Sequence, residues 1–135
     1  MGIFDWLFGK VEIKEENFSQ ELKDEIKKQE VDDKGYSKLV NRNIKGIKHE
    51  KEGRVDLAIK LYEKNITDNF DGSHPYNRLA IIYRKKKDYQ NEIRVLNKAI
   101  NMFSDLMSTS PRLDIEPKLE KFKKRLEKSK TLIKY

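Results

Sequence analysis

Amide and aliphatic side chains recur at one fixed interval in this chain, and they are its best candidates for recognition chemistry. The interval from Asn43 to Asn77 is the same as that from Ile47 to Ile81. A carboxamide both donates and accepts hydrogen bonds, so a row of such groups can bind the backbone of an extended peptide. Isoleucines beside that row would offer apolar pockets. The pattern favours binding over catalysis.

Two cations follow Asn77 and Ile81 in the sequence. Arg84 and Lys85 lie one helical turn beyond Ile81. Guanidinium and ammonium groups bind carboxylates through charge-assisted hydrogen bonds. These two residues could therefore hold an acidic side chain or a terminal carboxylate.

The chain offers no set of residues typical of an enzyme. His49 lies next to Glu50, but no nucleophile accompanies them and no glycine-rich phosphate loop is present. With 0 cysteines and 2 histidines, thiolate sites and histidine-rich metal clusters are excluded. We therefore expect neither enzymatic activity nor a cofactor or metal.

Composition indicates one thin domain. The 135 residues suffice for a modest core, and 36% hydrophobic against 39% charged residues imply much solvated surface. No stretch approaches the ~20 apolar residues of a membrane span. Residues 3–8 are apolar but lack a basic leader and a cleavage site, so they do not resemble a secretory signal. The expected location is cytoplasmic.

The net charge of +7 is unevenly distributed along the sequence. Residues 1–35 carry 6 basic and 10 acidic side chains, whereas residues 36–135 carry 24 basic and 13 acidic ones. This asymmetry favours acidic partners, or the head-to-tail association of two copies as a homodimer, through electrostatic attraction.

Helical spacing of apolar residues recurs along the chain and strand signals are absent, so we predict an all-α fold. The first helix is expected to end before Gly35, and Gly53 is expected to separate the next two. Ser73 and Pro75 provide a helix start, and Pro117 would be the first residue of the last helix. The predicted helices cover residues 17–32, 36–52, 55–66, 74–86, 89–103 and 117–134.

Residues 39–72 and 73–106 carry the same pattern of small and apolar residues. Gly46 aligns with Ala80, Ile59 with Ile93, and the turn at 53–54 with that at 87–88. A period of this length is typical of helical-hairpin repeats.

The second stretch closely resembles a tetratricopeptide repeat. Its motif is carried by bulky, small and aromatic residues on two helices: Tyr76, Leu79, Ala80, Tyr83, Tyr89, Ile93, Leu96, Ala99 and Ile100. The first stretch matches more weakly, through Gly46, Gly53, Val55, Ala58, Ile59, Tyr62 and Ile66. Two polar residues depart from the pattern, Glu92 and Asn65. At each of them we expect a looser hairpin or an unusual hydrogen bond.

This resemblance implies antiparallel helical hairpins stacked as a short right-handed solenoid over residues 17–135. Helices 17–32 and 117–134 would serve as flanking caps with polar outer faces. Gly46 and Ala80 would lie where the helices of a hairpin cross, because only a small side chain permits such a close approach.

In this family the first helix of each hairpin lines a concave groove that binds a protein segment. The corresponding residues are the candidate partner-binding set: Val40, Asn43, Ile47, Glu50, Lys51, His74, Asn77, Ile81, Arg84 and Lys85. The basic-and-asparagine clamp of some relatives is not reproduced. The resemblance thus implies a protein–protein interaction adaptor for a peptide or protein segment.

Two other functions stay open. The basic run 84–87 and the lysine-rich last helix could contact nucleic-acid phosphates, although Phe122 and Tyr135 form no stacking platform. The apolar segment 1–16 could contact a membrane surface, or dock onto its own domain or a second copy. Its candidate docking residues are Ile3, Phe4, Trp6, Leu7 and Phe8.

Overall fold

The computed structural model describes the secondary structure of residues 20–133 and the side chains of residues 35–133. Every regular element within that range is a helix, and the range contains no strand, so the all-α prediction is confirmed. The elements are α2 (Gln20–Lys51), α3 (Val55–Thr67), α4 (His74–Lys85), α5 (Tyr89–Thr109) and α6 (Ile115–Ile133). The apolar segment 1–16 and its five docking candidates lie outside the described residues.

Helix α2 is continuous over 32 residues, where the sequence predicted two helices separated before Gly35. That prediction was wrong. A glycine inside a helix costs only about 1 kcal/mol relative to alanine, and no proline accompanies it here, so the helix continues. The side chains of the predicted cap at 17–32 lie outside the described part of the chain.

The chain separates into two compact units, residues 1–42 and 43–135. The first unit contributes the greater part of α2. The second unit contains α3 to α6, and the packing described below is that of its residues 43–133.

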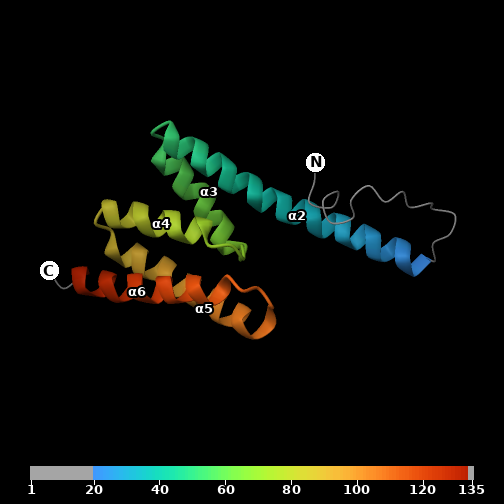
Figure 1. The fold of residues 1–135 in the computed structure, drawn as a ribbon. Coiled ribbons are helices and arrows are strands. Elements are labelled where there is room, and N and C mark those ends of the chain that lie inside the picture. The colour runs from blue at the N-terminus through green and yellow to red at the C-terminus, as the bar shows by residue number, and fades with distance from the viewer. Residues whose placement is uncertain (1–19, 134–135) are drawn as a thin grey trace. The chain divides into compact units, whose positions relative to one another are not determined.

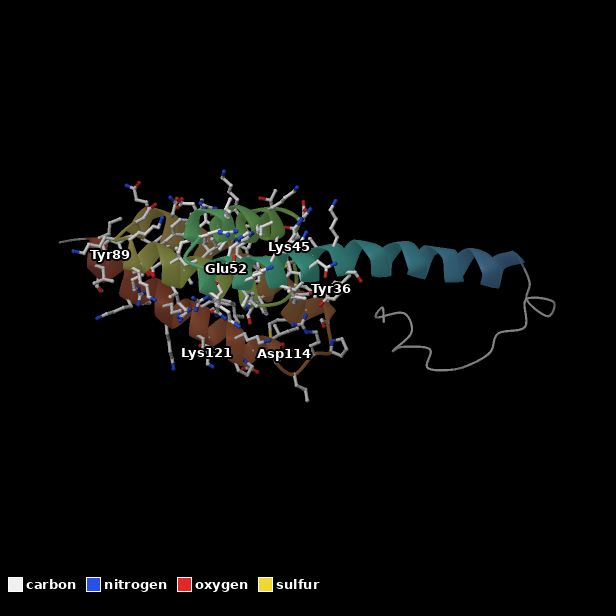
Figure 2. The ribbon with its side chains drawn as sticks, turned by 90° about the horizontal axis from the view of Figure 1, so that it is seen from above. Tyr36, Lys45, Glu52, Tyr89, Asp114 and Lys121 are labelled. Carbon is white, nitrogen blue, oxygen red and sulfur yellow. The ribbon has the colours of Figure 1, made fainter. Side chains whose placement is uncertain are left out.

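Helices α3, α4, α5 and α6 reverse direction one after another, and each packs against the next in the chain (Figure 1). Tyr89 and Asp114 lie at opposite ends of the α5–α6 pair (Figure 2). The core contains an aromatic group with one ring from each of α4, α5 and α6, namely Tyr76, Phe103 and Phe122. Their ring centroids are 5.3–6.4 Å apart. Helix α6 is therefore an integral part of the core.

Small residues lie where the helices approach most closely. Alanines 58, 80 and 99 are at most 1% exposed. A Cβ atom built on Gly46 would lie 2.7 Å from Cζ of Tyr62 on α3, closer than such atoms pack. Glycine at this position therefore allows the end of α2 to approach the Tyr62 ring.

The turns after α2 and α4 have the same backbone geometry, at aligned positions of the two stretches 39–72 and 73–106. Gly53 and Lys87 both have positive φ angles, 76° and 59°. The N–H groups of residues 53 and 54 donate to the carbonyls of residues 50 and 49, and those of 87 and 88 donate to the carbonyls of 84 and 83. Both helices thus end in hydrogen bonds from a left-handed residue and its successor.

The predicted starts of α3, α4 and α5 agree with the structure, whereas that of α6 differs. Ser73 is the N-cap residue of α4 and Pro75 lies in the first turn, as predicted, although the Ser73 side chain makes no capping hydrogen bond. Helix α6 begins at Ile115, because Pro117 is compatible with any position in the first turn and not only with the first. Asp88, which the sequence analysis did not single out, caps α5 by accepting a hydrogen bond from the N–H of Asn91.

Candidate functional site

A cavity of about 510 Å³ lies between α4 and α6. Its lining combines four cations, one amide and one aliphatic side chain: Asn77, Arg78, Ile81, Lys121, Lys124 and Arg125. Lys121 is labelled on α6 in Figure 2. Asn77 and Ile81 belong to the partner-binding set predicted from the sequence, and the structure brings both to this cavity.

Helical spacing explains why these six side chains share one cavity. Residues 77, 78 and 81 lie on one face of α4, and residues 121, 124 and 125 lie on one face of α6, each set at intervals of three and four. The remaining faces of the same helices supply core residues, among them Leu79 and Phe122. Burying the apolar faces therefore sets the orientation of the polar ones.

Arg78 is fixed by a carboxylate from α2. Its Nη2 atom donates to Glu50 Oε1 at 2.6 Å and its Nε atom to Glu50 Oε2 at 3.1 Å, while the hydroxyl of Tyr62 donates to Oε2 at 2.6 Å. Burial raises the pKa of the Glu50 carboxyl, but the hydrogen bonds from Arg78 and Tyr62 outweigh that effect and leave the pKa below its ordinary value. Glu50 therefore compensates the charge of Arg78.

Arg125 lies among like charges. Burial lowers the pKa of its guanidinium, and the positive charges of Arg84 and Arg78 lower it further, while the carboxylate of Glu92 partly offsets them. Its Nη1 atom donates to Oδ1 of Asn77 at 3.0 Å, which links the two walls of the cavity. This amide oxygen orients the guanidinium without neutralising its charge.

Lys121 and Lys124 are exposed, and neither pairs with a carboxylate of residues 35–133. Their neighbours on α6 behave differently, since Lys118 pairs with Asp114 and Lys123 with Glu120. The two cavity lysines therefore leave their charges available to a ligand.

Arg84 joins three helices instead of facing the cavity. Its Nε atom donates to Oε2 of Glu92 on α5 at 2.7 Å, and its Nη2 atom donates to Ser129 Oγ and to the carbonyl of Arg125 on α6. Glu92 is 2% exposed, and its second oxygen has no hydrogen-bond partner among the described residues. The sequence pattern predicted an unusual polar contact at Glu92, and the ion pair with Arg84 confirms it.

Asn43 and Asn65 form a second buried polar contact. Nδ2 of Asn65 donates to Oδ1 of Asn43 at 2.8 Å across α2 and α3. This bond confirms the expectation of an unusual hydrogen bond at Asn65. Because Asn43 is only 8% exposed, its amide packs helices together, and the structure does not bring it to the cavity beside Asn77.

The other predicted binding residues lie outside the cavity. His74 is half-buried with its ring edge against Tyr62, and burial lowers its pKa. Glu50 reaches the cavity only through Arg78. The remaining candidates do not line it: Val40 and Ile47 are half-buried, and Lys51 and Lys85 are exposed.

Sequence reasoning missed the contribution of α6. The spacing of Lys121, Lys124 and Arg125 marks one face of a helix, but Lys and Glu are mixed along that helix, so the sequence favoured a solvated surface and left contact with nucleic-acid phosphates as the alternative. What distinguishes these three cations is that they face Asn77 and Ile81 of α4 across one cavity, which depends on the tertiary structure; Lys128 of α6 also lacks a carboxylate partner among residues 35–133 but lies outside the cavity.

Within the described residues, no group of three or more His, Cys, Asp or Glu side chains could hold a metal ion. The described residues also contain no helix that is both long enough and apolar enough to cross a membrane. Comparisons with models of known protein families, with curated proteins and with solved structures gave no match.

Proposed function

We propose that this chain is a short adaptor of the tetratricopeptide type, which binds a peptide or protein segment on the face formed by α4 and α6. In this proposal α2–α3 and α4–α5 act as two hairpins stacked as a right-handed solenoid, and α6 closes the array. The observation that carries it is the open cavity in which Asn77 and Ile81 lie together.

Two features support the repeat interpretation. The turns at Gly53 and Lys87 occupy aligned positions of the two stretches and share φ signs and hydrogen-bond patterns. Gly46 and Ala80, which align in the same register, are both buried between helices. Repeats of this size build binding surfaces from the faces of successive helices.

Recognition would combine three kinds of contact. Asn77 offers amide donors to a peptide backbone, Ile81 offers an apolar surface, and the cations offer charge. A cavity of this size accommodates a few side chains of an extended segment, and the surrounding helix faces would contact the rest.

Affinity capture with the full-length chain tests this proposal. Ile81→Ser should abolish capture of proteins that the wild-type chain retains, because it removes the aliphatic surface of the cavity. Ile44→Ser is the matched control, since Ile44 is 57% exposed and does not line the cavity. Equal capture by all three chains, identified by mass spectrometry, would show that the α4–α6 face is not the binding site.

A further inference from the structure

The charge of the cavity is unbalanced. Of its four cations, only Arg78 has a carboxylate partner among the described residues, which is Glu50. Lys121 and Lys124 lack one within the same range. Arg125 contacts an amide and lies near Arg84 and Arg78; the nearby carboxylate of Glu92 is bonded to Arg84 and not to Arg125. Lys121, Lys124 and Arg125 therefore face the same cavity, and none of the three forms an ion pair with a carboxylate of residues 35–133.

Placing like charges together costs free energy unless an anion joins them. These uncompensated cations come from α6, whereas the aliphatic side chain of Ile81 comes from α4. The two walls thus offer different chemistry to one ligand: carboxylate recognition on α6 and apolar contact on α4.

We propose that the occupant of this cavity is an acidic segment of a partner protein, whose carboxylates pair with Lys121, Lys124 and Arg125 while an apolar side chain packs on Ile81. This inference rests on the proposed function and adds the partner's chemistry. It also assigns the charged half of the site to α6, which the sequence indicated to be a cap or a surface that contacts nucleic-acid phosphates.

The lining favours a protein segment over RNA. Proteins that bind single-stranded nucleic acid stack bases on aromatic rings, and none of the six lining residues is aromatic. An aliphatic side chain beside cations instead matches a segment that alternates acidic and apolar residues.

Selection from a random dodecapeptide display library on the immobilised full-length chain tests the inference. The selected peptides should be enriched in Asp and Glu relative to the starting library. A fluorescein-labelled peptide of the selected consensus should then bind Lys121→Ala/Lys124→Ala about five- to ten-fold more weakly than wild type, as expected for the loss of two solvent-accessible ion pairs.

The matched control is Lys123→Ala/Lys128→Ala. It removes the same charge from the same helix at exposed positions outside the cavity, and it should change the dissociation constant by less than about two-fold. Alanine is compatible with the helix in both variants, and circular dichroism verifies that α-helical content is retained.

Each other outcome overturns the inference in a recognisable way. If the selected peptides are not enriched in acidic residues but still require Ile81 for binding, the partner segment is not acidic, while the proposed function stands. If acidic peptides bind both lysine variants equally well, their binding site does not include Lys121 and Lys124 of α6. If no peptide is selected, or if a short oligouridine binds more tightly through Lys121 and Lys124, the occupant is not a protein segment.

Discussion

At the scale of single residues, charge compensation separates side chains that hold helices together from side chains that a ligand can reach. Arg84 neutralises the buried Glu92, and Arg78 is held by Glu50. Lys121 and Lys124 have no such carboxylate within residues 35–133. The role of a cation therefore follows from the side chains around it and not from its residue type.

Gly46→Ala should destabilise the fold, whereas Gly35→Ala should not. The new Cβ at position 46 would overlap the Tyr62 ring, and overpacking of this kind costs about 1–3 kcal/mol. At Gly35 nothing lies within 4 Å, so alanine should leave the free energy of unfolding unchanged or raise it by up to about 1 kcal/mol. Urea titrations measure both values, and equal effects would contradict the close approach of α2 and α3 at Gly46.

Glu50→Gln should make stability less dependent on acidic pH. Although burial raises the pKa of Glu50, the hydrogen bonds from Arg78 and Tyr62 leave it below its ordinary value. A carboxyl whose pKa is lower in the folded state contributes stability above its unfolded pKa and loses that contribution as the pH falls through the folded pKa. Between about pH 6 and pH 3, wild type should lose more unfolding free energy than the variant. Parallel losses in urea titrations would exclude a stabilising role for this carboxylate.

At the scale of elements, the two equivalent turns adopt the same backbone geometry with different residues. Each helix ends at a left-handed residue, which is glycine at position 53 and lysine at position 87. Only glycine adopts this conformation without steric cost, so the second turn is less favourable than the first.

Lys87→Gly should therefore raise the free energy of unfolding by about 0.5–1 kcal/mol, because it relieves the positive φ angle. Gly53→Ala should lower the free energy of unfolding by about 1 kcal/mol for the opposite reason. Thermal denaturation followed by circular dichroism measures both changes. A Lys87→Gly variant that melts below wild type would show that the lysine side chain contributes more than its backbone conformation costs.

At the scale of the whole molecule, α6 belongs to the core as much as to the surface. It supplies four buried apolar residues, Ile115, Leu119, Phe122 and Leu126. Burial of such side chains is worth about 1.5–3 kcal/mol each, which together is comparable to the total stability of a domain.

Truncation after Asp114 should consequently abolish cooperative unfolding, because the core rings of Tyr76 and Phe103 lose their contacts with Phe122. Removal of residues 1–34 is the control and should preserve the thermal transition, since the core cluster of the described residues contains none before Val55. A cooperative melt of the chain that ends at Asp114 would refute the assignment of α6 to the core.

Local periodicity predicted the all-α class and the approximate positions of α3 to α6. The resemblance to helical-hairpin repeats implied that the small residues Gly46 and Ala80 would lie between helices, and both are buried. These features follow from the sequence because helical spacing and side-chain volume act between residues that are close in the chain. The predicted end of the first helix before Gly35 was wrong, because the free-energy cost of one glycine is small compared with the stabilisation from the helical residues on both sides of it.

The sequence by itself determined which helix faces are apolar and which carry amides and cations. Only the tertiary structure decided that Asn43 pairs with Asn65, that Arg84 pairs with Glu92, and that the cations of α6 face Asn77 and Ile81. The physical reason is that electrostatic and hydrogen-bond partners are selected by distance in space. Helices far apart in sequence are brought together by packing of their apolar faces, and that packing then determines which charges remain uncompensated.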